Sequence, residues 1–153
     1  VLAMNMVGLE LNAVGNHEFD RGTKELQRLQ NGGCAQHTAV PPCRVDATFP
    51  GARFSYLAAN VKTADGGTLF PPTALRRFGR GANEVRVGFI GLTLRETATL
   101  VAPDAVTDVT FADEAETINT LVPQLRAQGA DAVVVLIHQG VSTKASYNDK
   151  SCD

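Results

Sequence analysis

The sequence predicts an α/β fold, in which a sheet of mixed strands is covered by helices. Apolar, strand-like runs alternate along the chain with amphipathic, helix-like segments. The strand-like runs are nearly continuous in apolar residues, which is typical of sheets that are covered on both faces. With 153 residues, of which 44% are apolar, the chain is long enough to bury one sizeable core.

The first half of the chain predicts two helices and one strand. Residues 1–8 are apolar at nearly every position and predict the end of a buried helix. Residues 11–14 predict a short strand, which Gly15 stops. Residues 21–30 carry two leucines three positions apart among polar residues, and they predict a helix that ends at the Asn-Gly-Gly of residues 31–33.

The second half predicts three strands and one helix. Residues 33–52 are rich in turn formers and predict a loop, and residues 54–61 predict a strand. Over residues 84–92, apolar and polar residues first alternate and are then followed by a continuous apolar run, which predicts a buried strand. Residues 113–128 have one apolar face and a glycine after their end, which indicates a helix, and residues 131–137 predict a final strand.

Charge and hydropathy exclude several classes of protein. The net charge of −2 is too small, and the apolar fraction too high, for an intrinsically disordered chain. A chain this close to neutral has no strong positive potential to attract nucleic acid or an anionic membrane, so neither is expected as a partner. The longest apolar run, residues 132–137, is much shorter than the roughly 20 residues of a membrane span.

The cysteines leave several possibilities open. Cys34 and Cys43 flank a short loop that one disulfide could close, and this would indicate an oxidising compartment. Alternatively, Cys34, His37 and Cys43 could contribute to a zinc site, although no fourth ligand lies nearby. Free surface thiols are a third possibility. Cys152 is left over, and its partner could lie in sequence outside this chain.

Chemically active residues follow two of the predicted strands. Residues 15–20 read Gly-Asn-His-Glu-Phe-Asp, and His138 comes directly after the strand over residues 131–137. Ligand sites in α/β sheets form beyond the carboxyl ends of the strands, where both loops lie. An amide oxygen, imidazoles and carboxylates together suit Mn, Fe or Zn better than Ca. Gly15 would let the backbone turn sharply and approach a ligand closely.

Structural explanations exist for each of these residues alone. A single histidine at a strand end is more often a hydrogen-bonded structural residue, Asp20 could cap the following helix, and Glu18 could be a solvated charge. His17-Glu18 does not open a zinc-protease motif, because Arg21 stands at its last position. The basic cluster of Arg76, Arg77 and Arg80 is most simply a solvated hairpin end. The combination of two polar strand-end loops is less easily explained in this way.

Residues 15–20 match the G-N-H-E-F-D signature of the 5′-nucleotidase and 2′,3′-cyclic phosphodiesterase branch of the calcineurin-like metallophosphoesterases. Residues 4–8, 56–61, 87–93 and 135–138 also resemble segments of that family, in the same order. The resemblance implies a four-layer α/β/β/α sandwich that is incomplete at both ends. Residues 1–153 would be part of one catalytic domain, without the C-terminal domain that recognises the nucleotide.

The resemblance also implies roles for individual residues. Asn16 and His138 would be ligands of one metal ion in a centre of two divalent ions, which could be Zn, Mn or Fe. His17 would face the phosphate as a catalytic residue, and Asp20 would be the carboxylate that pairs with it. A carboxylate on one imidazole nitrogen fixes the tautomer and raises the basicity of the other. Glu18 and Phe19 would support the loop.

The implied activity is hydrolysis of nucleotide phosphomonoesters by a metal-activated hydroxide. The family's D-x-H, G-D and G-H-x-H motifs are absent from the sequence. We therefore expect the chain to be a fragment that is inactive alone and binds metal weakly. The alternatives are a phosphoesterase with a non-nucleotide substrate and a non-catalytic relic or binding domain that keeps the fold. Loop cysteines and the resemblance favour a periplasmic or extracellular location in a bacterium.

Overall fold

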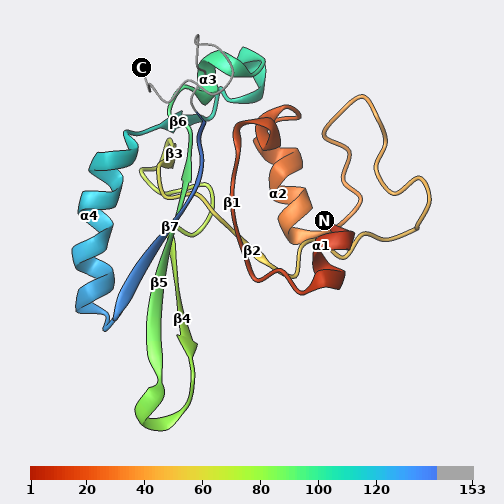
Figure 1. Cartoon of the computed structure of the whole chain (residues 1–153). Helices are drawn as coiled ribbons and strands as arrows, with labels where there is room; N and C mark the ends of the chain where they lie inside the picture. The colour runs from red at the N-terminus through yellow and green to blue at the C-terminus, as the bar shows by residue number, and fades with distance from the viewer. Residues whose placement is uncertain (141–153) are drawn as a thin grey trace, which may run out of the picture.

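A computed structural model describes residues 1–140 and shows an α/β arrangement of short sheets and helices (Figure 1). The helices are α1 (Leu2–Val7), α2 (Thr23–Asn31), α3 (Thr97–Leu100) and α4 (Glu114–Ala127), with 3-10 turns at Asn16–Phe19, Gly81–Asn83 and Pro103–Ala105. The strands are β1 (Leu11–Ala13), β2 (Ser55–Leu57), β3 (Val61–Thr63), β4 (Thr73–Phe78), β5 (Val85–Thr93), β6 (Val109–Phe111) and β7 (Ala132–His138). The α/β class predicted from the sequence is therefore confirmed.

The strands form three small sheets of mixed direction. β1 pairs with β2 in parallel, and β3 pairs with β6 antiparallel. The third sheet has the order β4-β5-β7, with β5 antiparallel to β4 and parallel to β7. In this sheet Thr93 is the register partner of His138, so the carboxyl ends of β5 and β7 finish side by side.

Helix α4 covers one face of the β4-β5-β7 sheet. It begins at Asp113, whose side chain accepts a hydrogen bond from the backbone N–H of Glu116. Leu125 of α4 is almost fully buried against the sheet. A Cβ on Gly88 of β5 would lie 2.9 Å from Leu125 Cδ1, so the glycine allows this helix to pack closely.

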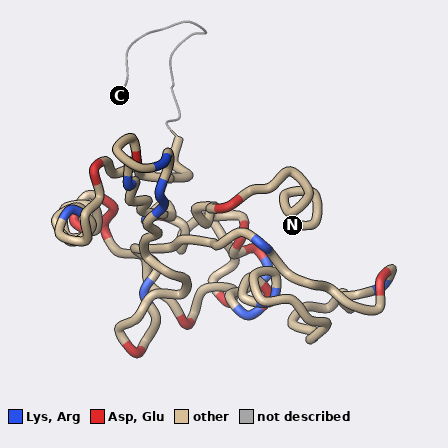
Figure 2. Tube along the Cα trace, turned by 90° about the horizontal axis from the view of Figure 1, so that it is seen from below, with Lys and Arg blue, Asp and Glu red and all other residues tan. Residues whose placement is uncertain are grey.

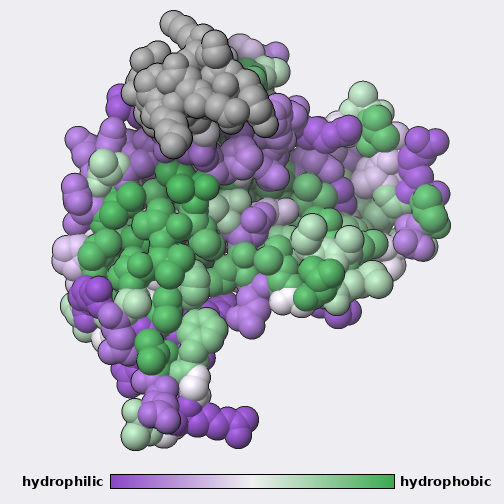
Figure 3. Space-filling view, viewed as in Figure 1, coloured by the Kyte–Doolittle hydropathy of each residue, from purple (hydrophilic) through white to green (hydrophobic). Residues whose placement is uncertain are grey.

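The opposite face of this sheet is covered at one end only. There Gly91 of β5 lies against Leu57 of β2, while Phe78, Val85 and Val134 remain exposed farther along the strands. Figure 3 shows hydrophobic residues gathered over the β5 and β7 region. The prediction that the apolar strands are covered on both faces does not hold for the whole of β7 within residues 1–140, because the face opposite α4 is covered only near β1 and leaves Val134 exposed.

A second core lies between the β1-β2 pair and α2. It contains Val14, Phe19 and Leu26, which are all fully buried. Tyr56 of β2 stacks edge-on against Phe54, with ring centroids 5.2 Å apart. This core fixes the segment between β1 and α2, which is the segment that carries residues 15–20.

Several sequence predictions need correction. Residues 2–7 are helical, but none of them is buried: Met6 and Val7 face solvent, and Asn5 ties the helix to the backbone of residues 51 and 53. The run 54–61 forms two short strands, β2 and β3, since its middle turns to contact β5 at Gly91. Strands β4 and β6 and helix α3 were not predicted. Arg76 and Arg77 belong to β4, and Arg80 lies in the turn that follows it.

The charged side chains of both signs are interspersed along the trace (Figure 2). Among residues 1–140, each helix is too short or too polar to cross a membrane.

Candidate functional site

The carboxyl ends of β1 and β5 are held together by a buried polar network. Asn60 and Thr93 are both fully buried. The Asn60 side chain accepts a hydrogen bond from the Thr93 backbone N–H (2.9 Å) and donates one to the Thr93 carbonyl (2.7 Å). The Thr93 hydroxyl donates to the carbonyl of Val14, the residue that precedes the Gly15 loop (2.7 Å). Fully satisfied networks of this kind rigidify their surroundings, so the network fixes where the loop begins.

This arrangement brings the two predicted polar loops together. A Cβ on Gly15 would lie 3.0 Å from Cγ of His138 and 2.7 Å from Oε2 of Glu18. His138, at the end of β7, therefore lies against the start of the loop that carries Asn16. The Gly15 backbone is extended (φ −88°, ψ 174°), so the predicted sharp turn at this residue is wrong. The absent side chain instead permits the close approach.

Residues 16–19 form a single 3-10 turn, and its last residue, Phe19, anchors it in the hydrophobic core. Phe19 is fully buried and packs edge-on against Phe111, with ring centroids 5.2 Å apart. Asn16 is 9% exposed, and none of the side-chain hydrogen bonds found within residues 1–140 involves its amide. Among the described residues no fully enclosed side-chain nitrogen or oxygen lacks a hydrogen-bond partner, so the Asn16 amide is not an orphaned buried group. Its oxygen could accept a ligand.

His17 and Asp20 form a pair at the surface of the same loop. Nδ1 of His17 lies 3.0 Å from Oδ2 of Asp20, and the two side chains are 75% and 52% exposed. Asp20 does not cap α2, which starts at Thr23 after Gly22, so that alternative is wrong. The contact with Asp20 fixes the orientation of the ring and leaves Nε2 free for a further partner.

The donor set fits part of a metal site. Asn16 offers an amide oxygen and His138 an imidazole nitrogen, a mixture that suits Mn, Fe or Zn. Within residues 1–140, no group of three or more His, Cys, Asp or Glu side chains is close enough to hold a metal ion. A slot of about 250 Å³, lined by residues 11–13 of β1 and 136–138 of β7, opens beside His138. These residues could therefore supply some ligands of a centre, but not all of them.

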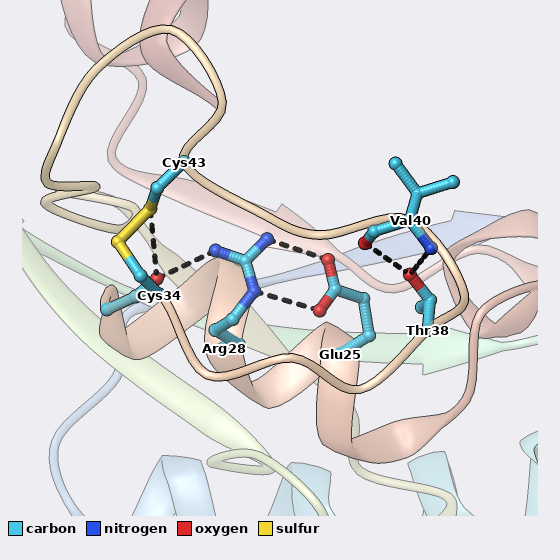
Figure 4. Close-up of polar contacts among 7 residues, drawn as sticks. Glu25, Arg28, Cys34, Thr38, Val40 and Cys43 are labelled. Carbon is cyan, nitrogen blue, oxygen red and sulfur yellow. Dashed lines mark hydrogen bonds and ion pairs between the residues drawn. A yellow bond between two sulfur atoms is a disulfide. The ribbon is translucent and has the colours of Figure 1, made fainter.

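The cysteine loop is closed by a disulfide. Cys34 and Cys43 are bonded, with their Cα atoms 5.7 Å apart (Figure 4). The disulfide prediction is confirmed. The zinc site with His37 and the free-thiol alternative are both wrong for this pair, because the two sulfur atoms are bonded to each other and neither is a free thiolate. Cys152 lies outside the described residues.

The loop is also fastened to α2 by Arg28, whose side chain forms a largely buried ion pair with Glu25 within the helix. Glu25 accepts two hydrogen bonds from Arg28, at 2.7 and 2.8 Å, and the side chains are 12% and 10% exposed. Arg28 also donates to the carbonyl of Gly33 (2.9 Å) and lies 5.0 Å from the centre of the Phe49 ring. The Arg28 hydrogen bonds lower the pKa of Glu25, and the Glu25 carboxylate raises the pKa of Arg28.

Two structural residues of the site were missed by sequence reasoning. Asn60 lies in the predicted strand 54–61 and Thr93 directly follows the predicted strand 84–92, and neither was assigned a role. Asn60 is a polar residue within the apolar run 56–61, and a buried polar residue needs a partner. That interruption was the available signal. Thr93 gave none, because a threonine at a strand end is common.

No family model matches the chain. Comparison with known proteins nevertheless finds relatives over most of its length. It is 34% identical over 135 residues to the endonuclease YhcR of Bacillus subtilis, covering 88% of this chain and 10% of that protein. Among solved structures, the calcineurin-like phosphoesterase YfkN from Bacillus subtilis superposes with a TM-score of 0.70 at 26% identity. That match covers 94% of this chain and 39% of YfkN.

A 5′-nucleotidase precursor from Thermus thermophilus has a TM-score of 0.61 and 31% identity, covering 88% of this chain and 22% of that one. The chain thus spans well under half the length of the relatives it matches. Those relatives include 5′-nucleotidases, UshA proteins, a 2′,3′-cyclic-nucleotide 2′-phosphodiesterase and calcineurin-like phosphoesterases. The chain is therefore homologous to the 5′-nucleotidase and 2′,3′-cyclic phosphodiesterase branch of the calcineurin-like phosphoesterases.

Proposed function

We propose that this chain is part of the catalytic domain of a metal-dependent phosphoesterase that hydrolyses nucleotide phosphomonoesters. The observation that carries the proposal is the meeting of the two strand-end loops. His138 lies against Gly15, the residue that precedes Asn16, and the 3-10 turn Asn16–Phe19 carries His17, which pairs with Asp20 at the end of the turn. Ligand donors and an oriented imidazole beside one another are what phosphate ester hydrolysis requires.

His17 is proposed to act on the leaving group. Water attacks phosphorus, the bond from phosphorus to the ester oxygen breaks, and the departing oxygen takes a proton, giving an alcohol and phosphate. His17 can place Nε2 toward that oxygen, because Asp20 holds Nδ1 at 3.0 Å. Its exposure leaves the ring accessible to a substrate from solvent. The side chain would thus stabilise charge on the phosphate or protonate the leaving oxygen.

Asn16 and His138 are the residues proposed to hold metal. A pair of divalent ions, when bound, supplies a hydroxide nucleophile and neutralises charge on the phosphate oxygens. Two protein ligands are fewer than either ion needs. We therefore expect weak metal binding and no activity from the 153-residue chain alone, and further ligands from a longer polypeptide.

The proposed setting is the periplasm or the outside of a bacterial cell. The Cys34–Cys43 disulfide is stable in oxidising compartments. One relative, from Listeria monocytogenes, is a cell wall protein that is 33% identical over 143 residues. Nucleotides released outside the cytoplasm would be the substrates there.

The test begins with the coding sequence on both sides of the chain. We expect D-x-H and G-D motifs upstream and a G-H-x-H motif downstream in the same reading frame. The complete protein should then release phosphate from AMP in the presence of Mn²⁺ or Zn²⁺. The His17→Ala and Asn16→Ala variants should lower this activity by about 10²-fold or more. Val45→Ala, at an exposed position of the disulfide loop, is the control.

Other outcomes would point to the alternatives. A reading frame without the missing motifs, together with no metal-dependent activity, would support a non-catalytic domain that keeps the fold. Activity on a sugar phosphate but not on AMP would support a non-nucleotide phosphoesterase. Because one relative is named an endonuclease, single-stranded DNA belongs in the substrate panel. Preference for DNA over AMP would contradict the proposed substrate.

A further inference from the structure

The two loops that carry the proposed metal ligands follow strands of different sheets. Asn16 lies after β1, which pairs with β2, and His138 ends β7, which pairs with β5. The slot of about 250 Å³ lies between residues 11–13 of β1 and residues 136–138 of β7. Among residues 1–140, no backbone hydrogen bond joins β1 to β7. Pairing of these two strands therefore does not set how closely Gly15 approaches His138.

Thr93, the last residue of β5, is connected to both loops. Its backbone is the register partner of His138 in the parallel pairing of β5 with β7. Its hydroxyl donates a hydrogen bond of 2.7 Å to the carbonyl of Val14, the residue before Gly15. Thr93 and Val14 are both fully buried, so this bond lies away from solvent, where a hydrogen bond is electrostatically stronger. One residue thus fixes the end of β7 relative to the start of the Gly15 loop.

The backbone of Thr93 is in turn held by Asn60. The Asn60 amide accepts a hydrogen bond from the Thr93 N–H and donates one to the Thr93 carbonyl. It also donates to the carbonyl of Ala112 (3.0 Å), and the Ala112 N–H donates to the Asn60 carbonyl (2.8 Å). Both polar atoms of the Asn60 side chain therefore have partners. This arrangement fixes the backbone from which the Thr93 hydroxyl is directed at Val14.

Close packing beside Thr93 joins the same two sheets. Two residues earlier on β5, Gly91 lies against Leu57 of β2, and its carbonyl accepts a hydrogen bond from the Ala59 N–H (2.7 Å). Gly91 and Thr93 lie on the same face of β5, because alternate residues of a strand share a face. The Thr93 hydroxyl is the connection that a single substitution of nearly the same shape, threonine to valine, can remove.

We propose that Thr93 is a positioning residue of the metal site. Its hydroxyl sets the placement of Asn16 relative to His138, and Asn60 acts through it. Groups behind the ligands of a metal site orient those ligands, and their loss typically lowers metal affinity by about 10–100-fold. This inference rests on the proposed function for the identity of the two ligands. The approach of Gly15 to His138 needs no metal and can be measured separately.

The first measurement is the nuclear Overhauser effect between the Gly15 α-protons and the His138 ring, in the 153-residue chain without metal. A Cβ on Gly15 would lie 3.3 Å from Cδ2 of His138, so we expect a strong signal from the parent chain. Thr93→Val removes the hydroxyl and should weaken this signal. Thr93→Ser keeps the hydroxyl and should preserve it.

Thr97→Val is the matched control. Thr97 is also fully buried, and its hydroxyl also donates to a backbone carbonyl, that of Leu94 (2.6 Å). That bond stays within one turn of the chain and does not join the two sheets, so the signal should remain. Thr93→Ala is a second variant in case Thr93→Val does not fold. It removes the hydroxyl without placing a methyl group against the buried Val14 carbonyl, and it should weaken the signal in the same way.

The second measurement is the Mn²⁺ affinity of the complete protein, followed by the electron paramagnetic resonance signal of free Mn²⁺. Thr93→Val should lower this affinity by about 10–100-fold, whereas Thr93→Ser and Thr97→Val should stay close to the parent. A merely structural role of Thr93 would lower the midpoint of urea denaturation and leave the affinity of the folded protein unchanged.

Three outcomes would overturn the inference: an unchanged Overhauser signal in both Thr93→Val and Thr93→Ala, equal losses of Mn²⁺ affinity in Thr93→Val and Thr97→Val, or a loss in Thr93→Ser as large as that in Thr93→Val. The proposed function fails separately. A complete parent protein that binds no Mn²⁺, with an Overhauser signal that still depends on the Thr93 hydroxyl, would refute the metal site and leave the placement of the two loops by Thr93 standing.

Discussion

The loop at residues 15–20 and the loop at residues 33–51 carry similar residue types but differ in how their polar groups are used. Both contain histidine together with possible metal ligands, and both follow regular elements. In the disulfide loop the cysteines bind each other, and Arg28 is shared between Glu25 and Gly33. At the other loop the Asn16 amide and one nitrogen of His17 have no hydrogen-bond partner within residues 1–140.

This difference separates a structural segment from a candidate site. Polar groups that satisfy one another contribute to the free energy of unfolding, and they have little capacity left for a ligand. Groups held in place without partners contribute little to stability and can bind a ligand without first breaking other bonds. Substitutions in the two loops should therefore have opposite effects on stability and on function.

Arg28→Met should have the largest effect on stability. It removes the ion pair with Glu25, leaves that carboxylate largely buried without a partner, and releases the disulfide loop at Gly33. We expect the free energy of unfolding to fall by about 3–4 kcal/mol, measured by urea denaturation.

Arg76→Met is the matched control. Its ion pair with Glu10 is longer (3.3 Å), its side chains are 36% and 71% exposed, and its loss should cost at most about 1 kcal/mol. Equal effects would show that the Arg28 pair is not structural.

Replacing both Cys34 and Cys43 by serine should have the next largest effect. Their disulfide closes a loop with a sequence separation of nine, so its loss should cost about 2–3 kcal/mol in the chain-entropy account. The measurement is denaturation of the double variant against the parent, both carrying Cys152→Ser so that no thiol exchange occurs. Mn²⁺ binding near Asn16, followed by paramagnetic line broadening, should be unchanged. A loss of that broadening would show that the two loops are not independent.

Glu25→Gln should have a smaller effect that depends on pH. Arg28 lowers the pKa of Glu25 in the folded state below its ordinary value of 4.5. The charged carboxylate therefore stabilises the fold at pH above about 4.5, and this contribution is lost as the pH falls through the lower, folded-state pKa. At pH 7 the variant should be less stable by about 1–2 kcal/mol. The difference between parent and variant should shrink in denaturation curves recorded at progressively lower pH between 5 and about 3, and a constant difference would contradict the assignment.

Much of this contrast could be predicted from the sequence, but not all of it. Residues 15–20 and His138 were identified because polar residues directly follow apolar strands, and the disulfide because two cysteines flank a short loop. The sequence could not exclude zinc at Cys34 and His37, since the choice depends on the distance between the sulfur atoms. Nor could it show that Gly15 serves close approach to His138, because those residues are brought together by the pairing of β5 with β7 and by the Thr93 bond to Val14, which link distant parts of the chain. Short strands such as β6 are stabilised by their partners, and three residues carry too little pattern to predict.

Asp20→Asn should have the smallest effect on stability and a large one on function. The pair with His17 is exposed, and exposed ion pairs contribute at most about 1 kcal/mol, so the denaturation curve should hardly move. The amide carries no negative charge, so it no longer stabilises the doubly protonated, cationic ring, the form in which Nδ1–H is held at residue 20 while Nε2–H donates its proton to the leaving oxygen. In the complete metal-loaded protein, phosphate release from AMP should fall by about 10²-fold or more.

Aryl phosphates with acidic leaving groups should be affected much less, because their leaving oxygen needs no proton. Equal losses for AMP and for such an aryl ester would show that Asp20 only supports the loop. A loss of stability comparable to that of Arg28→Met would remove the distinction between the two loops.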